Sequence, residues 1–217
     1  MFRCKELDIS HVNIHGIKTE FVFGWQKPYP KIKTVRRIIE VTDYYMKMYP
    51  DINLALVGDG LSTVEVEHKL GLIDRIMDDK VVTPQDEGVR AMHTYISDNG
   101  CSIIAFNSYM LNELCNWNFG IVGKNPVKLK KDILIKNVTD KPYVQYIFAH
   151  EFAHAIDAQY ELYKNRLIQK IYEEQEENFK NISEFIAECF VTSESYANNE
   201  VANSVRNEMN KVVLGRL

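Results

Sequence analysis

The segment that most constrains the fold runs from Tyr143 to about Tyr163, where we expect one long helix. It contains the sequence His-Glu-Phe-Ala-His at residues 150–154. Residues four apart in a helix lie one turn apart on the same face, so two histidines at this spacing can bind one metal ion. The apolar neighbours of the motif predict a buried helix with one polar edge. These neighbours are Ile147, Phe148, Phe152 and Ala153.

The expected ligands in this motif are His150 and His154, and Glu151 stands where it can hold a water bound to the metal. A motif this short also arises by chance, with the histidines in the core or on the surface and the glutamate solvated. Zinc used for hydrolysis takes three protein ligands and keeps one position open. The third ligand must therefore come from elsewhere in the chain.

The next apolar segment supplies a candidate for that ligand. Residues 183–190 read Ser-Glu-Phe-Ile-Ala-Glu-Cys-Phe, so Glu184 and Glu188 again lie one helical turn apart among apolar neighbours. A buried carboxylate without a partner is costly, and a metal together with a metal-bound histidine would satisfy both groups. We expect Glu184 to be the third ligand and Glu188 to orient the His150 imidazole from outside. The alternative is an ordinary glutamate pair on a solvated face.

Two other ligand sets compete with this one. Asp157 also lies on the face of the motif and could supply the third ligand instead of Glu184. The metzincin pattern requires glycine at position 157 and a ligand at position 160, where this chain has Asp157 and Tyr160. The glutamate pair on a second helix matches the motif better than either.

Together, His-Glu-Phe-Ala-His-Ala-Ile-Asp and Ser-Glu-Phe-Ile-Ala-Glu-Cys-Phe resemble the gluzincin metallopeptidases, specifically the anthrax lethal factor-like catalytic domains. The resemblance covers residues 150–157 and 184–190. It implies Zn²⁺ held by His150, His154 and Glu184, with Glu151 as the general base. It also implies that Asp157 is a supporting hydrogen-bonding residue near the site.

One feature departs from that family. Lethal factor-like enzymes usually carry a tyrosine a few residues before the third ligand, where it stabilises the oxyanion. No tyrosine lies between residues 177 and 183 of this chain. Tyr172, Tyr196 or a tyrosine from the first lobe could serve, and the sequence does not distinguish among them.

The chain as a whole predicts an α+β fold of the zincin-like type. We expect a single domain, residues 1–217, in which a mixed α/β lobe with a small sheet (1–130) precedes a helical lobe (140–217), with the active-site cleft between them. Gly120 to Pro142 is the least regular stretch and is expected to link the lobes. The other expected elements are helices at 31–49, 63–77 and 198–214, a helix that is capped by Asn181 or Ser183 and ends at about Ser195, a buried strand at 52–57, and a hairpin formed by 95–97 and 101–106.

Composition limits the class of protein and its partners. The net charge of −4 gives no general attraction to nucleic acid or anionic membranes. No secretory signal or membrane-spanning run is evident, so a cytoplasmic protein is expected, with export by a specialised route left open. The four cysteines form no Cys-x-x-Cys pair and are expected to be reduced and mostly buried.

The expected function is that of a zinc-dependent endopeptidase acting on an extended protein or peptide substrate. Zincins commonly bind substrate as an added strand at a sheet edge, for which Cys101 to Phe106 is our candidate; a plain core strand is the alternative. No substrate-binding residue is identified. A second hypothesis is a non-catalytic zinc-binding module, structural or adaptor, on a peptidase scaffold. Retention of Glu151 favours the enzyme, because a structural zinc site needs no general base.

Overall fold

A computed structural model describes residues 19–24, 27, 29–60, 63, 89–97, 100–114, 143–175, 178–195 and 198–215. These residues form an α+β structure with a four-stranded mixed sheet. The expected helix at 63–77, except Thr63, and the expected link at 120–142 lie outside the described residues. Cys4, Cys115 and Tyr196 also lie outside them.

The chain divides into two compact units, Met1–Asp43 with Asn53–Asn116, and Tyr44–Ile52 with Trp117–Leu217. The division falls within helix α1 (Ile32–Met48). The single domain with lobes at 1–130 and 140–217 stays a prediction.

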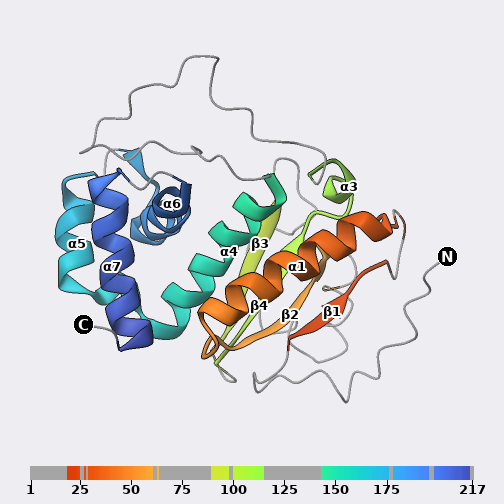
Figure 1. The fold of residues 1–217 in the computed structure, drawn as a ribbon, viewed down its shortest axis with the longest axis horizontal. Helices are drawn as coiled ribbons and strands as arrows, with labels where there is room; N and C mark the ends of the chain where they lie inside the picture. Colours follow the sequence, from red (N-terminus) through yellow and green to blue (C-terminus); the bar gives the residue numbers. More distant parts are fainter. Residues whose placement is uncertain are drawn as a thin grey trace, which may run out of the picture. The chain divides into compact units, whose positions relative to one another are not determined.

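The first unit contains the sheet (Figure 1). Its strands are β1 (Glu20–Val22), β2 (Leu54–Asp59), β3 (Ala91–Ile96) and β4 (Cys101–Phe106), in the order β1-β2-β4-β3. Strands β1, β2 and β4 are parallel, while β3 pairs with β4 in an antiparallel hairpin, as predicted. Every residue of β2 and β4 is buried, as expected for nearly continuous apolar strands.

The expectation that Cys101 to Phe106 forms a sheet edge is wrong. The segment is β4, an inner strand that pairs with β2 on one side and β3 on the other. Its backbone groups are therefore occupied by the sheet, and the alternative of a plain core strand holds. The edges of this sheet are β1 and β3.

The second unit contains four longer helices beyond α1, labelled in Figure 1. They are α4 (Tyr143–Tyr160), α5 (Arg166–Glu173), α6 (Ile182–Ser195) and α7 (Glu200–Leu214). Helix α6 packs against both α4 and α7, and α5 packs against α7. The first unit also holds the short helix α3 (Leu111–Leu114). No helix of the described residues is long and apolar enough to cross a membrane.

Helix α4 ends at Tyr160, before the predicted end at about Tyr163, and contacts around the helix end account for the difference. Glu161 adopts a left-handed conformation with φ of 51°, which stops the α-helix, and a 3-10 turn follows at Leu162–Lys164. The Asp157 side chain accepts a hydrogen bond from the Tyr163 backbone N–H at 2.8 Å. This bond replaces one that a continued helix would have supplied.

An aromatic cluster forms much of the core of the second unit. Tyr45 stacks on Phe148 with 5.7 Å between ring centroids, and Phe152 and Phe190 lie next to both Tyr45 and Tyr49. Four of these five residues are fully buried, and Tyr49 is 2% exposed. Large aromatic side chains supply most of the apolar area that holds such a helical unit together.

An ion pair lies against this cluster. Arg206 donates to Glu194 at 3.0 Å, and its guanidinium carbon lies 3.5 Å from the centroid of the Phe190 ring. Tyr45 donates its hydroxyl to the same glutamate at 2.6 Å. Burial, followed by the charge of Glu194, raises the pKa of Tyr45 far above its usual value, so this hydroxyl stays a donor.

Replacement of Arg206 by alanine should destabilise the chain by about 2–3 kcal/mol, because it leaves the Glu194 carboxylate, whose side chain is only 11% exposed, without its cation. The free energy of unfolding from urea titration measures this loss. Lys211→Ala is the matched control on the same helix, where an exposed pair with Glu208 should contribute no more than about 0.5 kcal/mol. Equal losses in the two variants would contradict a stabilising role for the Arg206–Glu194 pair.

Candidate metal centre

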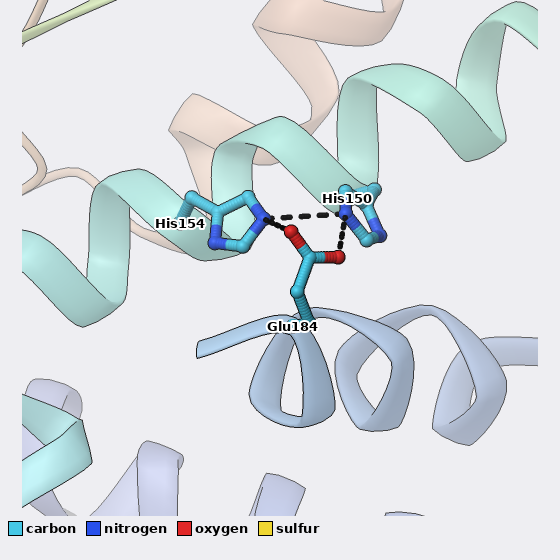
Figure 2. Close-up of side chains that lie close together, drawn as sticks. All are labelled: His150, His154 and Glu184. Carbon is cyan, nitrogen blue, oxygen red and sulfur yellow. Dashed lines mark hydrogen bonds and ion pairs between the residues drawn. The ribbon is translucent and has the colours of Figure 1, made fainter. Parts of the chain in front are cut away.

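The two histidines of the motif lie on α4, and the first glutamate of the second pair lies on α6. Figure 2 shows both imidazoles and the Glu184 carboxylate pointing toward one another. One donor atom from each of His150, His154 and Glu184 lies within 4.8 Å of the others. The described residues bring together the three side chains that the sequence analysis selected as ligands.

The distances fit a tetrahedral metal site. The Nε2 atoms of His150 and His154 are 3.2 Å apart, and the Glu184 carboxylate oxygens lie 3.4 Å and 3.7 Å from them. Donors about 2.0–2.1 Å from one zinc ion at tetrahedral angles lie about 3.3 Å apart. Two imidazoles and one carboxylate also form a donor set that zinc uses in catalytic sites. The separations and the types of donor therefore both suit a divalent metal ion, of which Zn²⁺ is one.

The capped start of α6 fixes the position of Glu184. Asn181 accepts a hydrogen bond from the Glu184 backbone N–H at 2.9 Å and is therefore the cap, which resolves the choice between Asn181 and Ser183. Glu184 lies in the first turn, where a carboxylate is favoured by the helix dipole. Its side chain is 38% exposed, whereas each histidine side chain is 15% exposed.

Glu188 lies behind His150. Its Oε1 atom is 3.6 Å from His150 Nδ1, and within the described part of the chain that nitrogen has no hydrogen-bond partner. Tyr146 donates its hydroxyl to the same Oε1 atom at 2.7 Å. Glu188 thus lies next to the outer nitrogen of His150 at a separation that exceeds a hydrogen bond, and its role in orienting the imidazole stays a prediction.

Asp157 reaches the site through an intermediary. Its Oδ2 atom accepts a 2.5 Å hydrogen bond from the Ser183 hydroxyl, and that hydroxyl lies 3.1 Å from His154 Nδ1. Its Oδ1 atom accepts from the Tyr163 backbone. Both carboxylate oxygens are thus engaged away from the three clustered donors, which favours Glu184 over Asp157 as the third ligand.

Two residues of this arrangement, Tyr146 and Ser183, were not predicted as site residues. Tyr146 precedes His150 by four residues, so the same helical spacing that relates the histidines could have indicated it. Ser183 was considered only as a helix cap. Of the tyrosines considered for the oxyanion, Tyr172 packs its ring 5.5 Å from that of Phe185.

The two histidines have opposite pKa shifts. Burial is the largest influence on His150 and acts to lower its pKa, but the hydrogen bond to Glu184 and the charges of Glu151, Glu188 and Glu184 raise it overall. Burial, followed by the charge of His150, lowers the pKa of His154 to about 4. The bond to His150 lowers the pKa of Glu184 to about 2. In the metal-free site His150 is therefore protonated in preference to His154.

No protein-family model, curated protein or solved structure matches the chain. The geometry and chemistry of the residues themselves are therefore the basis for assigning a function.

The pKa shifts predict how zinc binding depends on pH. Zinc must displace the proton from His150, whose pKa is raised above 6.5, while His154 stays neutral down to about pH 4. Zinc affinity should fall about tenfold for each pH unit between about pH 6 and 4.5. Competition with a colorimetric chelator, corrected for the protonation of the chelator, measures this slope. A hundredfold fall per unit, expected of two ordinary histidines, would contradict it.

The third ligand can be tested by substitution. Glu184→Ala should abolish stoichiometric zinc binding, whereas Asp157→Ala should still bind one zinc per chain at excess zinc, because Asp157 contributes no donor. Metal content after gel filtration in zinc-containing buffer, measured by atomic emission and corrected for the zinc in the buffer, distinguishes the two. Loss of zinc from Asp157→Ala together with retention in Glu184→Ala would assign the third position to Asp157.

Proposed function

We propose that the chain is a zinc-dependent endopeptidase that hydrolyses peptide bonds of an extended polypeptide. The observation that carries this proposal is the convergence of His150, His154 and Glu184 from two helices, with Glu151 retained between the histidines. Among the described residues this group has three donors and not the four of a closed structural zinc site. The zincin-like, gluzincin character of the fold is part of the same proposal.

His150, His154 and Glu184 would hold the metal. When bound, zinc supplies a water molecule of lowered pKa and polarises the substrate carbonyl. Glu151 would serve as the general base, accepting a proton from the attacking water and later delivering it to the leaving amine. Glu151 is half-buried on α4, and its negative charge contributes to the raised pKa of His150.

A second candidate is a non-catalytic zinc-binding module, structural or adaptor. The observation that favours it concerns the tyrosines near the site. Tyr146 lies with its ring 6.3 Å from that of His150, but its hydroxyl is donated to Glu188 and its side chain is buried. This tyrosine is therefore engaged in holding the site and is not presented to a substrate.

Glu151→Gln separates the two candidates. The variant should bind one zinc per chain like the unsubstituted protein, but its cleavage rate should fall by about 10²–10⁴, because the amide cannot take a proton. The assay incubates the zinc-loaded chain with a proteome-derived peptide library and identifies new termini by mass spectrometry. Glu173→Gln, an exposed position on α5, is the control and should leave cleavage unchanged.

Two results would count against the peptidase. Equal cleavage by Glu151→Gln and the unsubstituted chain would remove Glu151 from the mechanism. Zinc uptake with no cleavage of any library peptide by the unsubstituted chain would favour the non-catalytic module.

A further inference from the structure

We propose that Ser183 is a positioning residue of the metal centre, whose hydroxyl links the ligand His154 to the buried carboxylate of Asp157. The inference rests on the metal site of the proposed function, but not on peptidase activity. It assigns a role to a residue that sequence analysis treated only as a possible helix cap, and it specifies how Asp157 acts on the site.

The three groups form a continuous chain of polar contacts. His154 Nδ1 lies 3.1 Å from the Ser183 hydroxyl, which donates to Asp157 Oδ2 at 2.5 Å. The second oxygen of Asp157 accepts the Tyr163 backbone N–H at 2.8 Å. Asp157 is 3% exposed, so its carboxylate is largely shielded from solvent.

The direction of these hydrogen bonds follows from their chemistry. His154 Nε2 faces His150 and Glu184, so it must offer a lone pair there in order to bind a metal. The ring proton then belongs on Nδ1, and that N–H needs an acceptor. Ser183 can accept it because its own single proton is donated to a carboxylate, which only accepts. The chain therefore selects the tautomer of His154 that binds metal.

The position of Ser183 on α6 gives the contact a second consequence. Asn181 already caps the helix, so the Ser183 hydroxyl is not needed there. Ser183 directly precedes Glu184, whereas Asp157 and His154 lie on α4. The Ser183 contacts thus hold the first turn of α6 against α4 at the level of the ligands, and the same residue orients one ligand and places the next. Outer groups of this kind typically change metal affinity 10–100-fold.

Zinc affinity of the full chain at pH 7.5, measured by chelator competition, tests the proposal. Ser183→Ala should bind zinc about 10–100-fold more weakly, while Ser183→Thr, which keeps the hydroxyl, should stay within about threefold of the unsubstituted chain. Ser193→Ala is the matched control, because it removes from the same helix a hydroxyl that donates to the Phe190 carbonyl at 2.8 Å, away from the three ligands. Thermal unfolding of each metal-free variant checks that it is folded.

A double-mutant cycle separates this role from a general loss of structure. If Ser183 acts through Asp157, the Ser183→Ala/Asp157→Ala variant should bind zinc about as weakly as the weaker single variant. Unchanged affinity in Ser183→Ala, a threonine variant as weak as the alanine one, or additive losses would overturn the proposal. If Ser183→Ala does not fold, Asp157→Asn decides: affinity equal to that of the unsubstituted chain overturns it, and a loss of about tenfold or more supports it.

The outcome also distinguishes this inference from the proposed function. An unsubstituted chain that takes up no zinc would overturn both. Zinc uptake with normal affinity in Ser183→Ala would overturn only the role of Ser183. Zinc uptake with the expected losses, but without peptide cleavage, would overturn only the peptidase.

Discussion

The second unit depends on the packing of two mainly apolar helices that must also accommodate five ionisable side chains. An unpaired charge in such an interface would cost several kcal/mol. Each group instead has a partner on the facing helix: Glu184 beside both histidines, Glu188 with Tyr146, and Asp157 with Ser183. Because these contacts all cross from α4 to α6, they fix the register of the two helices as well as satisfying the charges.

The same interface explains why the two histidines do not behave alike. They lie one turn apart with their Nε2 atoms 3.2 Å from each other, so a second positive charge on the pair would be strongly disfavoured. His150, surrounded by three glutamates, keeps the proton, and the pKa of His154 falls to about 4. A metal ion held between the imidazoles and the Glu184 carboxylate would take the place of that positive charge.

Sequence reasoning succeeded where the determining geometry is local. Helical spacing fixes the relation of His150 to His154, and apolar context selected Glu184, so their convergence was predictable. The order of strands in a sheet depends on pairing between segments far apart in the sequence, which sequence periodicity does not reveal. For this reason the prediction that Cys101–Phe106 lies at a sheet edge was wrong. Tyr146 and Ser183 acquire their contacts only once α4 and α6 are packed in a particular register. The early end of α4 is a local feature, a bond from the Tyr163 backbone to the Asp157 side chain, but apolar periodicity does not indicate it.

The ligands differ in how they are held and in how they are exposed. On the side facing the protein, His150 is backed by Glu188 and Tyr146, both nearly buried, while His154 is backed by Ser183 and Asp157. The Glu184 side chain, in contrast, is 38% exposed. A site that only stabilises a fold gains from burial on every side, because water competes for the metal. Rigid support behind the histidines combined with an accessible carboxylate is the arrangement that a metal needs if it is to exchange water for substrate.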